Sequence, residues 1–160
     1  QLFGRGYFLG IPVPAVTMFV TFIILYILLH KTVFGRQTYA MGGNEKAAFI
    51  SGIKVNKLKI MIYSLAGLMS AMAGAILTSR LNSAQPTAGM SYELDAIAAV
   101  VLGGTSLTGG KGRILGTLIG VLIIGVLNNG LNLLGVSSFY QQVVKGVVII
   151  IAVLIDRKNK

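Results

Sequence analysis

The sequence predicts an all-α, polytopic membrane protein with about five transmembrane helices, one of them short, and a short helix outside the membrane. Apolar residues make up 54% of the chain, charged residues make up only 11%, and the mean hydropathy is +0.80. A soluble domain carries about 25% charged residues, so this chain has too little polar surface to cover a water-soluble globule. Long apolar runs alternate with Lys and Arg clusters, as spans alternate with their connecting loops.

The composition also excludes several classes of function. There are no cysteines, so neither disulfides nor thiolate chemistry can contribute. A net charge of +10 would suggest nucleic acid binding in a soluble protein. Here the cations lie between apolar runs, where orientation signals and contacts to anionic lipid belong. We therefore expect contact with membrane lipid and no nucleic acid partner.

Five apolar runs are expected to form the spans: residues 14–29, 60–79, 92–107, 114–127 and 143–155. Pro12 and Pro14 suit the entrance of the first helix, where a missing N–H has little effect. Small residues recur every fourth position in two of the runs, which permits close approach of helix backbones in lipid. They are Ala66, Ser70 and Gly74 in the second run, and Gly112, Gly116 and Gly120 at the fourth.

The segment 92–107 is short for a span and is consistent with either a crossing or a re-entrant helix. The distribution of cations favours crossing. Six cations mark the loop 31–59 as cytoplasmic: Lys31, Arg36, Lys46, Lys54, Lys57 and Lys59. A crossing segment then places Lys111, Arg113 and the C-terminal Arg157, Lys158 and Lys160 in the cytoplasm as well, whereas a re-entrant segment places them outside.

Side chains that could carry out catalysis or bind a metal are scarce in this chain. One His, four acidic residues and no Cys cannot supply a metal-ligand cluster at ordinary spacing, so we expect no metal site and no catalytic residues. Glu93 and Asp95 suit the N-terminus of the third helix. The run GGTSLTGGKGR resembles a phosphate-binding loop but fails the pattern at Thr105 and Gly112. We therefore expect no bound cofactor or nucleotide in this chain.

Residues 44–52, NEKAAFISG, are predicted to form one short helix in the charged loop. Asn44 is the expected N-cap, Glu45 favours the positive helix end, and Gly52 is the expected stop. Such a short helix is not stable alone in water, so it must dock on lipid or, in the sharper interpretation, on a cytoplasmic protein. The candidate docking residues are Gly43, Asn44, Glu45, Ala47, Ala48, Phe49, Ile50, Ser51 and Gly52.

Amide side chains near the other ends of the spans suggest a solute pathway, because amides donate and accept hydrogen bonds and can pair with sugar hydroxyls. The candidates are Asn128, Asn129, Asn132 and Gln85. The alternative is interfacial capping and turn formation. Lys145 lies inside the fifth run, where it can either snorkel outward or face a water-filled path.

Two long stretches, GRQTYAMGGNEKAAFISGIKVNKLK and NSAQPTAGMSYELDAIAAVVLGGTSLTGGKGRILGTLIG, together with LNNGLNLLGVSSFYQQVVKGVVI, resemble permeases of sugar-type ABC importers. The resemblance covers essentially all of residues 1–160 and corresponds to the C-terminal half of the family's membrane domain. It implies a multi-pass subunit of the bacterial inner membrane that translocates ribose or a similar monosaccharide. In that family residues 44–52 correspond to the segment that couples the permease to its ATPase.

The same resemblance implies the partners. They are a cytoplasmic ATP-binding subunit that carries ATP and Mg²⁺, a periplasmic sugar-binding protein, and a second permease copy that forms a homodimer. Two other classes stay open: a passive sugar facilitator or channel without a docking helix, and a structural membrane subunit without a pathway. A membrane enzyme is disfavoured because the reactive groups are lacking.

Overall fold

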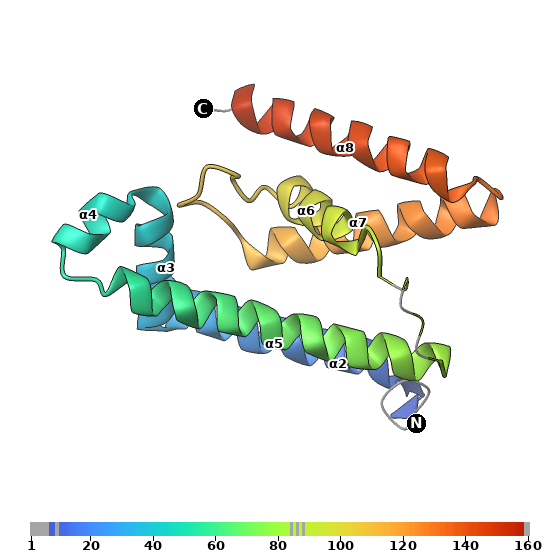
Figure 1. The fold of residues 1–160 in the computed structure, drawn as a ribbon, viewed down its shortest axis with the longest axis horizontal. Coiled ribbons are helices and arrows are strands. Elements are labelled where there is room, and N and C mark those ends of the chain that lie inside the picture. The colour runs from blue at the N-terminus through green and yellow to red at the C-terminus, as the bar shows by residue number, and fades with distance from the viewer. Residues whose placement is uncertain (1–6, 9, 84, 86, 88, 159–160) are drawn as a thin grey trace. The chain divides into compact units, whose positions relative to one another are not determined.

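The computed structural model describes the chain except for residues 1–6, 9, 84, 86, 88 and 159–160, and it consists of two compact units. Unit 1 is Gln1–Met90 and unit 2 is Ser91–Lys160. Each unit is helical, apart from one short strand pair in unit 1 (Figure 1). Lys160, one of the cations used to orient the C-terminus, lies outside the described residues.

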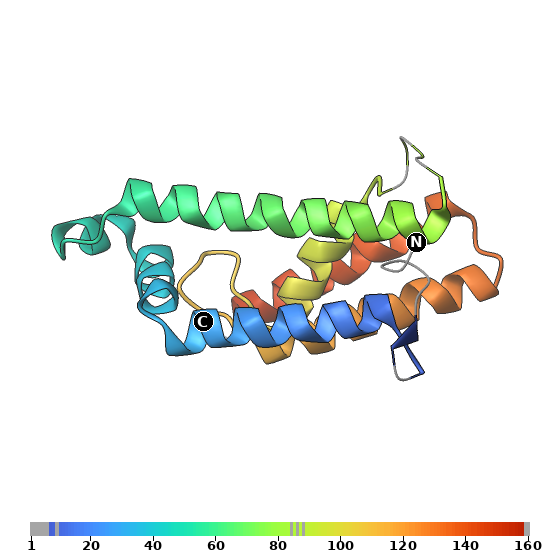
Figure 2. The ribbon, with the colours of Figure 1, turned by 90° about the horizontal axis from the view of Figure 1, so that it is seen from below.

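Unit 1 begins with the two-residue strands β1 (Tyr7–Phe8) and β2 (Ile11–Pro12), which pair antiparallel. Four helices follow: α2 (Val13–Lys31), α3 (Val33–Gly43), α4 (Glu45–Ile50) and α5 (Val55–Leu81). The long helices α2 and α5 run antiparallel, residues of both line one cavity of about 250 Å³, and α3 and α4 form the connection between them (Figure 2). The loop 31–59 therefore joins neighbouring ends of two long apolar helices.

Local sequence explains how α2 begins and how the chain turns from α2 into α3. Pro12 is the residue before the helix and Pro14 lies in its first turn, as expected. Inside α2 the hydroxyl of Thr17 donates to the carbonyl of Val13 at 2.8 Å, which satisfies that donor without water. The turn into α3 depends on Gly35, which is buried, because a side chain there would run into the backbone of Leu29.

Unit 2 contains α6 (Tyr92–Leu102), α7 (Ile114–Leu133) and α8 (Ser138–Lys158). The helix α6 packs antiparallel along α7, since Ala99 lies against Gly120 and Gly103 lies against Gly116. Ala98, Ala99 and Ile124 form the buried core of the unit. The close packing predicted for the Gly116–Gly120 step is confirmed, and its partner is the short helix α6.

Three described helices are long and apolar enough to cross a membrane: α2, α5 and α7. The helix α8 adds a fourth apolar helix, and α6 is the short one, so the predicted membrane fold is confirmed. Eleven residues of α6 rise about 16 Å, roughly half of a hydrocarbon core. The predicted segment 92–107 is helical only to Leu102. Because α6 runs along α7 in one direction, its ends lie at different levels of the unit, which favours crossing over a re-entrant hairpin.

The small-residue stripe of α5 behaves differently from the one in α7. Ala66, Ser70 and Gly74 are exposed, and a Cβ at Gly74 would meet nothing within 4 Å. The nearby helix α2 instead faces Met69 and Ile76, on the other side of α5. The predicted helix partner for this stripe is therefore absent from the described part of unit 1.

Candidate functional site

The helix α4 in the charged loop forms largely as predicted. The side-chain oxygen of Asn44 accepts a hydrogen bond from the backbone N–H of Ala47 at 3.0 Å, so Asn44 is the N-cap. Glu45 lies in the first turn, where a carboxylate is favourable. The helix ends at Ile50, and Gly52 follows with a φ of +84°, a conformation that favours glycine.

Ala48 holds α4 in place and does not face outward. It is buried within unit 1, and its carbonyl oxygen accepts a hydrogen bond from the N–H of Ile53 at 3.1 Å. Lys59 of α5 forms an ion pair with Glu45 at 2.7 Å, which joins the two helices at the surface. The side chain of Ala48 is thus covered by the chain itself, and its predicted contact with a partner stays a prediction.

The outward side of α4 carries large apolar side chains. Phe49 is 71% exposed and Ile50 is 84% exposed, although both lie in the most charged loop of the chain. A groove of about 540 Å³ runs beside them. It is lined by Glu45, Lys46, Phe49, Ile50, Val55 and Asn56, which we call the α4 patch. An apolar surface rimmed by charges is typical of a protein contact.

The remaining predicted residues of this loop are all exposed. Gly43, Asn44, Ala47, Ser51 and Gly52 lie next to residues of the α4 patch along the chain. Of these, Asn44 and Ser51 also shape the helix, since the hydroxyl of Ser51 donates to the carbonyl of Ala47 at 2.8 Å. The surface that a partner could touch is therefore formed by Phe49 and Ile50, with small and polar residues around them.

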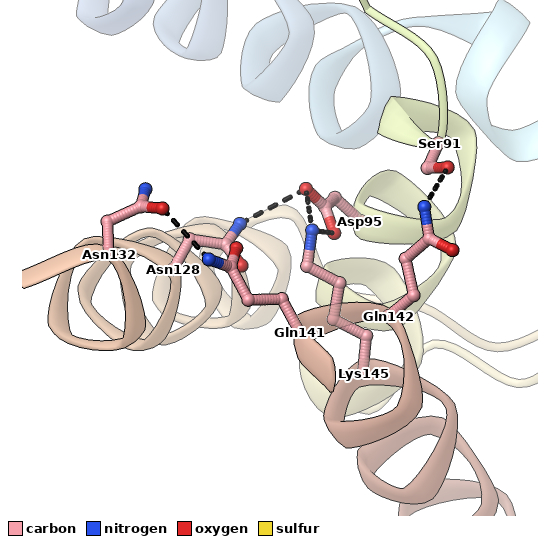
Figure 3. Close-up of polar contacts among 7 residues, drawn as sticks. All are labelled: Ser91, Asp95, Asn128, Asn132, Gln141, Gln142 and Lys145. Atoms are coloured by element: carbon pink, nitrogen blue, oxygen red, sulfur yellow. Dashed lines mark hydrogen bonds and ion pairs between the residues drawn. The ribbon is translucent and has the colours of Figure 1, made fainter. Parts of the chain in front are cut away.

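Unit 2 holds a second polar site that joins its three helices (Figure 3). The ammonium of Lys145 on α8 lies 2.7 Å from one carboxylate oxygen of Asp95 on α6 and donates to the other oxygen at 3.0 Å. The amide nitrogen of Asn128 on α7 donates to the second oxygen at 3.1 Å. The side chains of Lys145 and Asp95 are only 12% and 18% exposed, so the pair is shielded inside an otherwise apolar unit.

One turn away, a set of uncharged polar groups extends this site. Gln141 donates to the side-chain oxygen of Asn132 at 2.9 Å and to the carbonyl of Val136 at 2.8 Å. Gln142 donates to the hydroxyl of Ser91 at 3.3 Å. We call the seven residues the polar stack: Ser91, Asp95, Asn128, Asn132, Gln141, Gln142 and Lys145.

The structure brings together only part of the predicted pathway. Asn128 and Asn132 belong to the polar stack, while the neighbouring Asn129 is exposed and forms no part of it. Gln85 lies exposed in the loop after α5, in unit 1, so it is not among the residues that the stack assembles. No group of three or more His, Cys, Asp or Glu side chains that could hold a metal ion occurs in the described parts of the chain.

Sequence reasoning missed Asp95, Gln141 and Lys145 as members of one site. Both alternatives for Lys145, snorkelling or facing a water path, overlooked an acidic partner 50 positions away. A signal was available, because a cation inside an apolar run needs a nearby anion. Asp95 and Glu93 are the acidic residues of the neighbouring apolar segment, and Asp95 is the one that forms the pair.

Comparisons with known proteins place this geometry in a family. The family described as branched-chain amino acid transport system / permease component matches residues 2–153. The ribose import permease protein of Bacillus subtilis (strain 168) is 82% identical over 99% of this chain and 49% of its own length. Its counterpart in Escherichia coli (strain K12) is 63% identical over 99% of this chain and 49% of its own length.

A more distant relative carries a different sugar in its name. The xylose transport system permease protein of Haemophilus influenzae is 49% identical over 94% of this chain and 40% of its own length. The chain thus spans about half the length of the curated relatives that it matches. No solved structure matches it. The match over residues 2–153 nevertheless covers nearly the whole chain, and the chain belongs to this family of membrane transport permeases.

Proposed function

We propose that this chain is part of a membrane permease that imports ribose, or a similar monosaccharide, using ATP hydrolysed by a partner protein. The family description names amino acids, whereas the relatives with 63–82% identity are named for ribose import. Substrate therefore differs within the family, and the higher identities favour a pentose. The permease itself carries out transport and no covalent chemistry.

The α4 patch is the observation that carries ATP coupling over passive transport. A passive facilitator has no need of a capped helix that holds Phe49 and Ile50 out into water. Exposed apolar area is unfavourable by about 25 cal/mol per Å² until a partner covers it. A groove on a cytoplasmic ATPase subunit would cover it, and movement of that subunit would then be transmitted through α4 to α5. ATP and Mg²⁺ would be bound by that partner.

The orientation follows from charge. The six cations of loop 31–59 favour the cytoplasmic side of a bacterial inner membrane, and α4 lies in this loop. The polar stack lies where α7 ends and α8 begins, and the crossing direction of α6 would put these ends at the outer face. There a sugar-binding protein would deliver its ligand, and a second permease copy would complete the pathway.

The pathway assignment rests on amide chemistry. Asn128 and Asn132 are retained as pathway residues because they belong to one polar site. Asn129 and Gln85 are exposed and lie outside the polar stack, so they are not retained as pathway residues. This part of the proposal predicts that substitutions at Asn129 and Gln85 leave uptake unchanged.

The test is uptake of labelled ribose into vesicles that contain the intact permease, its ATPase and its binding protein. We expect accumulation above the external concentration with ATP and none with a non-hydrolysable analogue. Equilibration at the same rate with or without ATP would establish a passive facilitator instead. Xylose supplied as a competitor would distinguish a narrow from a broad pentose specificity.

A further inference from the structure

The polar stack has a regular arrangement that its individual contacts do not reveal. Each of the three helices of unit 2, or the residue just before it, presents two polar residues four positions apart. They are Ser91, the N-cap of α6, with Asp95 on α6, Asn128 with Asn132 on α7, and Gln141 with Lys145 on α8. Four residues span about 6 Å of a helix. The site therefore has an outer tier at the helix ends and an inner tier about one turn deeper.

The two tiers differ in charge. The outer tier contains only hydroxyl and amide groups, and its members pair with one another (Figure 3). The inner tier contains the Asp95–Lys145 ion pair and Asn128. One negative and one positive charge cancel, so the inner tier carries no net charge, which suits a neutral ligand. It offers instead one strong acceptor, one strong donor and one amide.

The inner tier is also incomplete. The amide oxygen of Asn128 is buried and has no hydrogen-bond donor among the described residues. A buried acceptor that loses its water without gaining a donor is unfavourable, so such groups in native structures generally have a partner. The carboxylate oxygen of Asp95 that lies 2.7 Å from the ammonium also lacks an aligned hydrogen bond. That oxygen is nevertheless occupied by the ammonium of Lys145, so the amide oxygen of Asn128 is the acceptor that is available to a hydroxyl donor.

We infer that the inner tier, Asp95, Asn128 and Lys145, is a contact site for the hydroxyl groups of the neutral sugar that passes through the permease. A hydroxyl donates one hydrogen bond and accepts others, which matches a site with a free amide oxygen beside an ammonium donor. The outer tier lies one turn nearer the helix ends. A passing sugar would first replace the hydrogen bonds between its side chains. This inference rests on the proposed import function and adds to it the residues that touch the solute.

The test measures ribose imported per ATP hydrolysed in the reconstituted importer, together with the melting temperature of each permease variant. Asn128→Ala removes the free acceptor, and Asn129→Ala is its matched control on the same helix. We expect Asn128→Ala to lower ribose imported per ATP about 3- to 10-fold, the effect of losing one hydrogen bond. Its melting temperature should change little, because the loss of the hydrogen bond to Asp95 is offset by removal of an unsatisfied buried oxygen. Asn129→Ala should change neither value.

A second variant distinguishes a contact between Asn128 and the sugar from a purely structural role of Asn128. Asn128→Ser keeps an oxygen that can accept a hydrogen bond, and it should retain more import per ATP than Asn128→Ala. Equal import per ATP in Asn128→Ala and Asn129→Ala would overturn the inference while leaving the proposed import function intact. A fall in melting temperature and import together, without recovery in Asn128→Ser, would make Asn128 a structural residue only. Absence of ATP-driven uptake by the unaltered importer would instead refute the proposed function.

Discussion

Two ion pairs of the same length lie in different surroundings, one exposed and one largely buried. Glu45 and Lys59 meet at 2.7 Å with side chains that are 55% and 42% exposed, beside the α4 patch. Asp95 and Lys145 also meet at 2.7 Å, but their side chains are 18% and 12% exposed within the apolar unit 2. Water and salt screen the first pair, whereas the second pair is largely removed from water.

The comparison shows that distance alone does not set the importance of an ion pair. The exposed pair contributes at most about 1 kcal/mol, and its loss leaves two hydrated charges. Breaking the buried pair leaves one charge without a partner in an apolar environment, which is strongly destabilising. The surface pair therefore adjusts the position of α4, while the buried pair joins α8 to α6 inside unit 2.

The largest effect is expected from breaking the buried pair. Asp95→Ala should lower the free energy of unfolding by about 3–5 kcal/mol, because the ammonium of Lys145 is left unpaired. Thermal unfolding of the purified permease would show it as a large fall in melting temperature. The double variant Asp95→Asn with Lys145→Met removes both charges and should recover most of the stability. A loss as small as that of the exposed pair would contradict the account.

A smaller effect is expected where α6 packs on α7. Gly120→Ala would press a methyl group against the carbonyl of Ala99 and should destabilise by about 2 kcal/mol. Gly125→Ala lies on the same helix, where a Cβ meets nothing within 4 Å. It should be neutral or stabilising by up to about 1 kcal/mol, since alanine favours helix. No destabilisation by Gly120→Ala in thermal unfolding would show that α6 does not pack closely there.

The N-cap of α4 comes next. Asn44→Ala removes the bond to the N–H of Ala47 and should destabilise α4 by about 1 kcal/mol. If α4 must be folded to bind the ATPase, affinity for that subunit should fall about fivefold. Asn44→Ser retains a capping oxygen and should keep most of the affinity. An unchanged affinity in Asn44→Ala would show that binding does not depend on this helix.

The smallest effect is expected from the exposed pair. Glu45→Gln should weaken the attachment of α4 to α5 by less than about 1 kcal/mol. The difference from the unaltered protein should shrink as salt rises, because the Debye length is only about 3 Å at 1 M salt. Titrating ATPase binding at low and high salt would check this. A difference that persists at high salt would imply a role for Glu45 in the contact itself.

Local features could be predicted from the sequence because they depend on near neighbours. The cap at Asn44, the stop at Gly52 and the entrance at Pro12 and Pro14 were all predicted, and the structure has them. The helical runs were predicted too, although α5 begins at Val55 and α8 at Ser138, before their most apolar parts. Polar residues at those positions extend the helices beyond the apolar stretch.

Features that depend on distant contacts could not be predicted in the same way. The sequence pattern does not show that Lys145 pairs with Asp95 or that Gly116 packs against Gly103, because each pair is separated by more than ten residues. Ala48 and Phe49 are adjacent in an apolar run, and only the packing of α4 shows that the first is buried and the second exposed. The apolar pattern of a span therefore does not predict which polar groups meet inside unit 2, and only the packed structure shows them.

If α4 is the contact for an ATPase, the affinity of that ATPase for the permease is the most direct measurement of it. Phe49→Ala removes the large exposed side chain without disfavouring helix, and Val126→Ala is a control of similar exposure (71% and 73%) within the apolar helix α7. We predict that Phe49→Ala weakens ATPase binding at least tenfold, as expected of a central apolar anchor, while Val126→Ala has no effect. Equal affinity of both variants and the unaltered permease would contradict ATP coupling through α4.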